Sequence, residues 1–258
     1  MRNSENALRM QAWGMTAKAW VKSHLRRIVG RYPEVYFALG RFRGEVFQRR
    51  RVTPQTDIVI DGYPRSANSF SVGAFKKAQY KSTKVAHHLH VPAHIMRACD
   101  LGIPTLLLVR HPVDAIVSHR ALHREGEIVE NAPRSALRIG FRPFFHSWID
   151  FYDTTREYID SVVVGLFDQV VTDFEKVLEK VNSKYDTKFS LFDHTEENEK
   201  KINSALGYHA GPSERRKKLK EEVRDNFEQF RCEHPGVVQK SVELYKTYEQ
   251  EAAQYNHP

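Results

Sequence analysis

The chain has few of the features that mark secreted and membrane-spanning proteins. Only two of its 258 residues are cysteine, so a lone disulfide is the most that could form, and we expect reduced thiols instead. No apolar run approaches the roughly 20 residues that cross a bilayer, and the N-terminus lacks the apolar core of a signal peptide. With 41% hydrophobic and 28% charged residues, we expect a cytoplasmic globular protein with one sizeable domain.

Two patterns that would assign other chemistries are also missing. The histidines show no spacing typical of metal ligands, so we expect no metal site. The nucleotide-kinase loop G-x-x-x-x-G-K-[ST] does not occur in the chain. A P-loop-type small-molecule kinase would need that lysine and a Mg²⁺ ligand after the loop, and neither is visible.

The net charge of +8 is concentrated near the N-terminus. Residues 1–52 hold 12 Lys or Arg and 3 Asp or Glu, which is +9, so the remaining residues sum to −1. A basic face spread over the whole fold is therefore not expected, and we expect no nucleic-acid partner.

The N-terminal residues form an amphipathic basic pattern. Apolar residues recur at helical spacing from Met10 to Ile28, with lysines and arginines between them, and a second helical stretch is predicted from Pro33 to about Gln48. One interpretation is a helical extension that packs on the core. A second is a helix that contacts a membrane surface or a partner, and a third is an organelle transit sequence.

The pattern changes after residue 52, so we divide the chain into a basic helical N-terminal extension (1–52) and one domain (53–258). Short apolar strands are predicted at Asp57–Asp61, Thr83–His88, Thr105–Val109 and Ser161–Phe167. Helices are predicted at about Ser69–Tyr80, Pro92–Leu101, Pro112–Leu122, Ser135–Tyr158, Thr172–Ser183, Thr195–Leu206, Ser213–Phe230 and Gly236–Tyr255. This alternation is typical of an α/β fold with a central parallel β-sheet flanked by helices. The polar stretch Arg124–Arg134 is predicted to be a mobile loop.

The loop after the first predicted strand has the composition of an anion site. It reads Gly62-Tyr63-Pro64-Arg65-Ser66-Ala67-Asn68-Ser69. If a helix opens near Ser69, the backbone amides from Ala67 to Phe70 point at one place, and the helix dipole favours an anion there. Arg65 adds a positive charge. Three further side chains add hydrogen-bond donors: Ser66, Asn68 and Ser69.

A second anion site is predicted after the strand that ends at Val109. Arg110 lies at the strand end, and Pro112 fits the first position of a helix. Ser118, two turns into that helix, can converge with Arg110 on one phosphate. The structural alternative is a buried Arg110 that pairs with a carboxylate.

Together the two segments resemble the sulfotransferases that use 3'-phosphoadenosine 5'-phosphosulfate (PAPS). The first loop is similar to the family's phosphosulfate loop, P-[KR]-S-G-[TN]-[ST]. The second motif, R-[NH]-P-x-[DE]-x-x-x-S, is matched by Arg110, His111, Pro112, Asp114 and Ser118. The resemblance implies a P-loop-NTPase-like sulfotransferase fold. It also implies that PAPS is the co-substrate, that 3',5'-bisphosphate (PAP) is the product, and that no metal is needed.

The same resemblance assigns roles to the motif residues. The loop from Arg65 to Phe70 would hold the 5'-phosphosulfate, and Arg65 would stabilise charge on the leaving oxygen, while Arg110 and Ser118 would hold the 3'-phosphate. Ala67 stands where the family usually has Gly, and it would be strained if that position needs a positive φ. Phe70 stands where the family often has a Trp that stacks on adenine, although a core Phe fits the position equally well.

A catalytic base is expected among three histidines at the end of the strand near residues 83–88. In the cytosolic members of the family a His-Leu pair at this strand end carries the base, and His88-Leu89 matches it best. His87 or His90 could take that role or line the acceptor pocket. Some carbohydrate sulfotransferases use a carboxylate instead, and Asp61 is the candidate nearest the loop.

The basic run that ends at Lys218 offers a further phosphate contact. In the family a basic C-terminal segment closes over the 3'-phosphate, and Arg215 or Arg216 could do so here, although a solvated helix face is an equal alternative. Phe167-Asp168-Gln169-Val170 resembles the family's Tyr-Glu-Asp-Leu segment, to which we assign a structural role only.

The sequence therefore predicts transfer of a sulfuryl group from PAPS to a hydroxyl, with an amine as the less favoured alternative. The acceptor is expected to be a small molecule or a carbohydrate, held by Arg124–Arg134 or by the N-terminal helices. Two other functions stay open: a small-molecule kinase, and a non-catalytic sulfotransferase-like protein that docks through its basic N-terminus.

Overall fold

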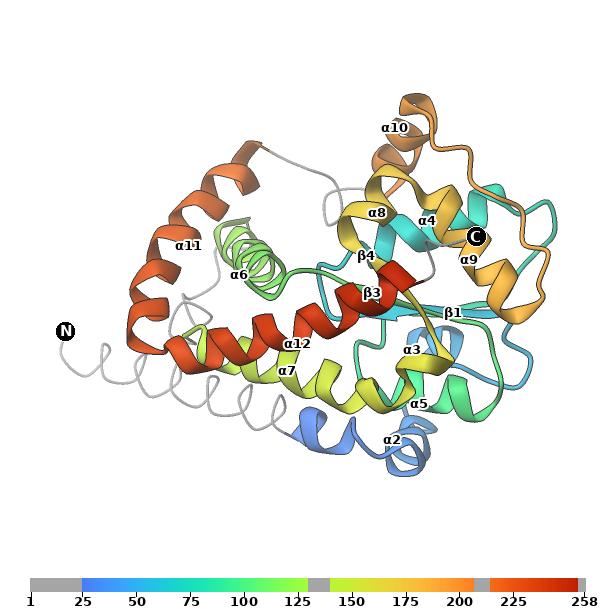
Figure 1. Ribbon diagram of the computed structural model, residues 1–258, viewed down its shortest axis with the longest axis horizontal. Coiled ribbons are helices and arrows are strands. Elements are labelled where there is room, and N and C mark those ends of the chain that lie inside the picture. The colour runs from blue at the N-terminus through green and yellow to red at the C-terminus, as the bar shows by residue number, and fades with distance from the viewer. Residues whose placement is uncertain (1–24, 130–139, 207–213, 255–258) are drawn as a thin grey trace.

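A computed structural model describes residues 25–129, 140–206 and 214–254 (Figure 1). Its described residues contain a four-stranded parallel sheet in the order β2-β1-β3-β4. The strands are β1 (Ile58–Gly62), β2 (Val85–His87), β3 (Thr105–Val109) and β4 (Val163–Leu166). The predicted α/β class, with a central parallel sheet flanked by helices, is confirmed.

Both faces of the sheet are covered, which explains why its strands are apolar at nearly every position. Along β3, Leu107 and Val109 face one hydrophobic core, whereas Leu106 and Leu108 face the other. Because successive strand residues point to opposite faces, two cores of this kind need continuous apolar strands and leave no place for alternating polar residues.

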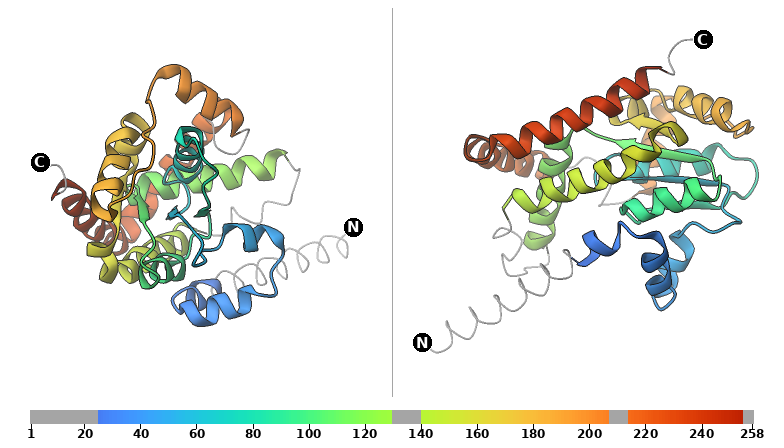
Figure 2. Two further views of the ribbon diagram at one scale, coloured as in Figure 1. Left: turned by 90° about the vertical axis from the view of Figure 1, so that its right-hand side faces the viewer. Right: turned by 60° about the horizontal axis from the view of Figure 1, so that its bottom comes forward.

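The helices divide between these two cores. Above the sheet in Figure 1 lie α4 (Asn68–Ala78), α8 (Phe167–Thr172), α9 (Phe174–Tyr185) and α10 (Glu196–Ala205). The other core is built with α5 (Pro92–Asp100), α6 (Pro112–Val129), α7 (Arg142–Thr155), α11 (Glu214–Glu233) and α12 (Pro235–Gln254). Helix α11 packs along α6 beside the sheet (Figures 1 and 2), which brings the C-terminal basic run near the second predicted motif.

The N-terminal part is helical and packs on the second of these cores. The single stretch expected up to Gln48 is two short helices, α2 (Pro33–Gly40) and α3 (Glu45–Arg50). Tyr36, Phe37 and Phe47 are buried in the core that also contains α5 and α7. Most of the predicted Met10–Ile28 helix lies outside the described residues, and the chain division at residue 52 stays a prediction.

The predicted loop Arg124–Arg134 is wrong in its first half. Helix α6 continues to Val129. Glu125 is fully buried there, and its carboxylate is compensated by an ion pair with Arg216 of α11. The rest of that loop lies outside the described residues. The helix predicted at Ser135–Tyr158 begins, where it is described, at Arg142 with Pro143 in its first turn, and after Thr155 it continues as a 3₁₀ helix, Arg156–Ser161.

The strand order marks where a ligand would bind. After β1 the chain moves to β2 on one side, and it then returns to β3 on the other side of β1, so the order reverses between β1 and β3. In open α/β sheets, ligands bind outside the carboxyl ends of the strands at such a reversal. Within the described ranges, no helix is long and apolar enough to span a bilayer.

Candidate active site

A cleft of about 810 Å³ lies at the carboxyl ends of β1 and β3. This volume is within the range of small-molecule sites. Among the described residues, its lining includes five cationic side chains: Arg65, Arg110, Arg216, Lys217 and Lys220. Only two acidic side chains in that described lining oppose them, Glu199 and Glu214. The surplus of positive charge fits a ligand with more than one anionic group.

The first loop starts from a tight approach of two strands. A Cβ at Gly62 would lie 2.1 Å from the carbonyl oxygen of Leu108, so the pairing of β1 with β3 requires glycine there. Beyond it, Arg65 and Ala67 both have positive φ, 71° and 67°. Ala67 is therefore strained, as expected for a residue other than glycine at a positive φ. For a residue with a Cβ this conformation costs on the order of 1 kcal/mol.

The first turn of α4 leaves its backbone amides available. Ala67 is the N-cap residue, and no side chain of the described structure caps this helix. The first amides of a helix have no partner within the helix, so an anion is a natural acceptor for them. Ser69 and Asn68 also line the cleft, although the Asn68 amide nitrogen donates to the Tyr63 carbonyl over 3.0 Å. Ser66 differs from the expectation, because its side chain is fully buried, against the Tyr152 hydroxyl, and is not part of the lining.

The two predicted motifs meet at Arg65. Its Nε donates to the hydroxyl of Ser118 at 3.1 Å, 53 positions along the chain. An Nη of Arg110 donates to the Arg65 carbonyl at 3.0 Å. The guanidinium of Arg110 also lies over the ring of Phe167, 3.7 Å from its centroid. The structure thus brings Arg65, Arg110 and Ser118 together, and their part in binding stays a prediction.

The cationic side chains of this cluster lie close together, and several of their pKa values are lowered. Burial, followed by the charges of Arg216 and Arg110, lowers the pKa of Arg65 to about 10, so it is still cationic at neutral pH. Burial also lowers the pKa of Arg110. For Lys220 the pKa falls because of burial and then because of Arg110, Arg65 and Arg216. An anion in the cleft would relieve this repulsion.

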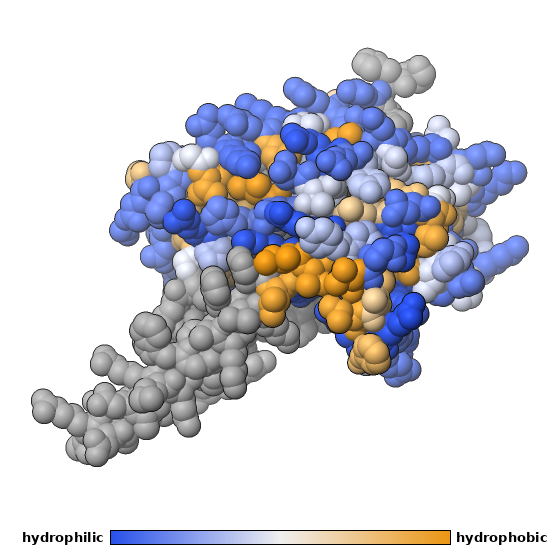
Figure 3. All heavy atoms as spheres, turned by 90° about the horizontal axis from the view of Figure 1, so that it is seen from below, coloured by the Kyte–Doolittle hydropathy of each residue, from blue (hydrophilic) through white to orange (hydrophobic). Residues whose placement is uncertain are grey.

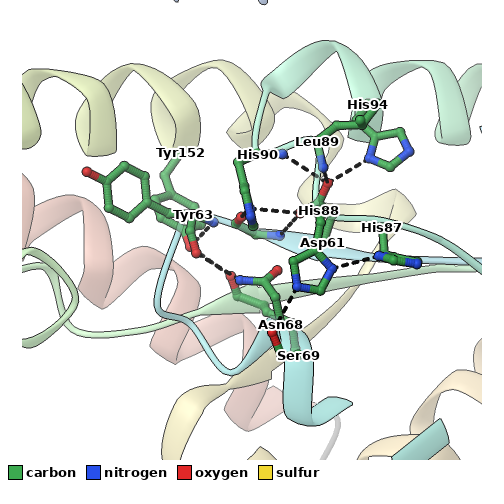
Figure 4. A network of polar contacts seen from close by, with 12 residues as sticks. Asp61, Tyr63, Asn68, Ser69, His87, His88, Leu89, His90, His94 and Tyr152 are labelled. Atoms are coloured by element: carbon green, nitrogen blue, oxygen red, sulfur yellow. Dashed lines mark hydrogen bonds and ion pairs between the residues drawn. The ribbon is translucent and has the colours of Figure 1, made fainter. Parts of the chain in front are cut away.

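The histidines of the strand end form a chain of polar contacts that reaches the loop (Figure 4). His88 Nε2 lies 3.0 Å from the Ser69 hydroxyl, and His88 Nδ1 lies 2.7 Å from His87 Nδ1. Burial lowers the pKa of His88 to about 4 and that of His87 to about 3. Both rings are therefore neutral at neutral pH, and His88, which lines the cleft, has a nitrogen that can accept a proton.

Asp61 holds this strand end in place and is not one of the residues that line the cleft. Its fully buried carboxylate accepts hydrogen bonds from the amides of Gly62, Leu89 and His90 and from Nδ1 of His94 (Figure 4). Burial alone would raise the pKa of Asp61, but His90 and His94 outweigh it, and the net pKa lies well below its usual range. Because its oxygens already accept these hydrogen bonds, the Asp61 carboxylate positions the strand end. The alternative in which Asp61 is the catalytic base therefore has no support from the structure.

The two arginines predicted near residue 215 have different environments. Arg215 is exposed and is not part of the cleft lining. Arg216 lines the cleft, is almost fully buried, and pairs with Glu125 at 2.6 Å. Phe70 lines the cleft and also packs edge-on against Phe174 and Phe192, so it belongs to the core as well.

Sequence reasoning missed several residues of the cleft. Phe167, assigned only a structural role, lies under Arg110, and the fact that it follows a strand parallel to β1 and β3 could have indicated this. His119, next to Ser118, also lines the cleft and contacts the ring of Tyr63. No group of three or more metal-ligating side chains occurs in the described part of the chain.

The comparisons with known proteins include a structural likeness. No protein-family model matches the chain, and no curated protein matches it in sequence. Among solved structures, it is similar to the mouse sulfotransferase SULT7A1 complexed with PAP, with 15% sequence identity and a TM-score of 0.40. The match covers 62% of this chain and 67% of that one. A likeness at this level carries no functional conclusion.

Proposed function

We propose that the protein transfers a sulfuryl group from PAPS to a hydroxyl of a small-molecule or carbohydrate acceptor and releases PAP. The observation that carries this proposal is the convergence of the two motifs at one cleft, with Arg65 in contact with Ser118 and with Arg110. Neither motif alone requires two anion sites, but their meeting at the sheet reversal suits a ligand with two separate phosphate groups.

The residues of the cleft fit such a nucleotide. The uncapped start of α4 and the charge of Arg65 suit the 5'-phosphosulfate. Arg110, which lines the cleft, suits the 3'-phosphate, the group that distinguishes PAPS from ADP and ATP; Ser118 is buried outside the cleft lining, where its hydroxyl holds Arg65. The cations of α11 that line the cleft, Lys217 and Lys220, add charge from the opposite side.

The chemistry follows from the positions of Arg65 and His88. The acceptor oxygen bonds to sulfur while the bond from sulfur to the 5'-phosphate oxygen breaks, and the electron pair stays on that oxygen. Arg65 and the loop amides balance the developing charge. The acceptor proton passes to Nε2 of His88, which is neutral at neutral pH, although burial lowers its pKa to about 4 and so makes it a weaker base than an ordinary histidine. As in phosphoryl transfer, a loose transition state leaves most of the work to positioning and charge stabilisation.

His87 has a supporting role in this proposal. The two Nδ1 atoms of His87 and His88 are 2.7 Å apart, so one ring must donate to the other. When His88 is the donor, its Nε2 carries the lone pair that a base needs; the Ser69 hydroxyl donates to that nitrogen, and the acceptor hydroxyl would have to take its place. His87 then sets the tautomer of His88, as the second residue of many catalytic pairs does.

The test is formation of PAP from PAPS with a panel of phenols, sugars and amines, without Mg²⁺. The wild type should form PAP with at least one acceptor. The rate should fall about 100-fold or more in the variant Arg65→Ala, because the substitution removes the cation that stabilises negative charge on the leaving oxygen. The matched control Arg215→Ala removes an exposed arginine outside the cleft lining and should leave the rate unchanged.

Two other outcomes point to the other candidate functions. Binding of PAP without turnover on any acceptor would indicate a docking protein with a sulfotransferase-like site. Phosphate transfer from ATP in the presence of Mg²⁺, with no use of PAPS, would indicate a kinase. Either outcome contradicts the proposal.

A further inference from the structure

The N-terminal helices carry exposed apolar side chains on their outer side. Seven large side chains at alternating spacings of three and four residues are exposed: Leu25, Ile28, Tyr32, Val35, Leu39, Phe42 and Val46. We call this set the apolar stripe. Figure 3, which views the molecule from below, shows apolar side chains gathered on this face. Phe42 is 90% exposed, a high value for an apolar ring of that size.

The stripe is not needed for the core, because the same helices already bury another face. Tyr36, Phe37 and Phe47 point inward and are buried, where α2 packs against α5 and α3 against β2. Helices α2 and α3 therefore have an inner apolar face that packs and an outer one that contacts solvent. Gathered apolar surface of this kind marks an interaction site more often than scattered exposed residues do.

The charge around the stripe favours an anionic partner, although Arg27 and Arg31 are paired with Asp150. Residues 25–52 contain eight arginines and two glutamates, a net charge of +6. Arg41, Arg43 and Arg49 are exposed beside the stripe. A second copy of the chain would bring the same positive charge to the contact and be repelled, whereas a surface of anionic lipids would be attracted.

We propose that the apolar stripe docks the protein on an anionic membrane surface. The apolar side chains would enter the boundary between headgroups and acyl chains, and the flanking arginines would contact the headgroups. This inference does not depend on the proposed function, since it stands on exposure and charge outside the cleft.

The N-terminal end of the stripe is joined to the segment that follows His88. Arg26 donates to the carbonyl of Leu89 at 2.7 Å, and the carbonyl of Gly30 accepts from the amide of Ala93 at 2.7 Å. A Cβ at Gly30 would lie 3.2 Å from the side chain of Val91, so glycine permits this close contact. Docking would therefore place the strand end that carries His88 near the membrane-facing side of these helices.

The test is flotation of the full chain with lipid vesicles. Vesicles of phosphatidylcholine with about one third phosphatidylglycerol should bind the protein at least about tenfold better than pure phosphatidylcholine. Leu39→Ser combined with Phe42→Ser should reduce that binding about tenfold or more. The control Tyr80→Ser changes a residue that is 97% exposed but outside the stripe, and it should bind as the wild type does.

Three outcomes would overturn the proposal. One is equal binding of the wild type and the Leu39→Ser, Phe42→Ser variant to anionic vesicles, with unchanged circular dichroism. Another is equal binding to neutral and anionic vesicles. The third is a dimer that the double variant dissociates, without vesicle binding, which would assign the stripe to a second copy of the chain.

Discussion

Replacing Arg110 separates the 3'-phosphate site from general nucleotide binding. A charge-assisted hydrogen bond of this kind contributes about 1.5–3 kcal/mol, so Arg110→Ala should weaken PAP binding about 10- to 150-fold. ADP lacks the 3'-phosphate and would lose only a longer-range attraction. At roughly 10 Å in a water-like dielectric this is about 0.4 kcal/mol, or about twofold.

The assay is calorimetric titration of the wild type and two variants with PAP and with ADP. Arg110→Lys is the matched control, because it keeps the charge but loses the planar group that lies over Phe167 and the fork that binds a phosphate. It should fall between the wild type and Arg110→Ala for PAP. If Arg110→Ala weakened PAP and ADP by the same factor, the assignment of Arg110 to a 3'-phosphate would be wrong.

Four further predictions follow from the site. His88→Ala should lower turnover about 100-fold or more with PAP affinity nearly intact, and normal turnover would place the base elsewhere. The His88 ring should titrate near pH 4 by NMR. Because its unfolded pKa is about 6.5, its contribution to stability should fall as pH drops from about 6.5 to 4. Lys217→Ala should weaken PAP binding about three- to tenfold, whereas its exposed neighbour Lys218→Ala should not, and equal effects would argue against the cleft. Asp61→Asn should lower the free energy of unfolding by about 2–4 kcal/mol in urea titrations, and a neutral effect would contradict its buried role.

The sequence predicted the parts of the fold that depend on local patterns. The strand Thr105–Val109 has the predicted bounds, because a five-residue apolar run that follows Gly102 and Pro104 and ends before Pro112 is short for a helix and is bounded by turn signals. The loop after Asp61 and the start of α6 at Pro112 follow from equally local signals. These three segments contain the two motifs, so the position of the cleft could also be predicted.

The sequence did not predict features that depend on distant partners. Helix α6 continues beyond Leu122 through a polar stretch, because Glu125 meets Arg216, 91 positions away. The inward turn of Ser66 and the exposure of Arg215 result from packing that no local pattern encodes. The place of Phe167 under Arg110 likewise needs the arrangement of β3 beside β4.

The most direct test of the central claim is calorimetric titration of the wild-type protein with PAP and, separately, with ADP, both without Mg²⁺. Two anion sites at one cleft predict tight PAP binding and ADP binding at least about tenfold weaker, since only PAP carries a phosphate at the 3' position. Equal affinity for the two nucleotides, or binding of neither, would contradict the claim that Arg65, Arg110 and Ser118 form a site for PAPS.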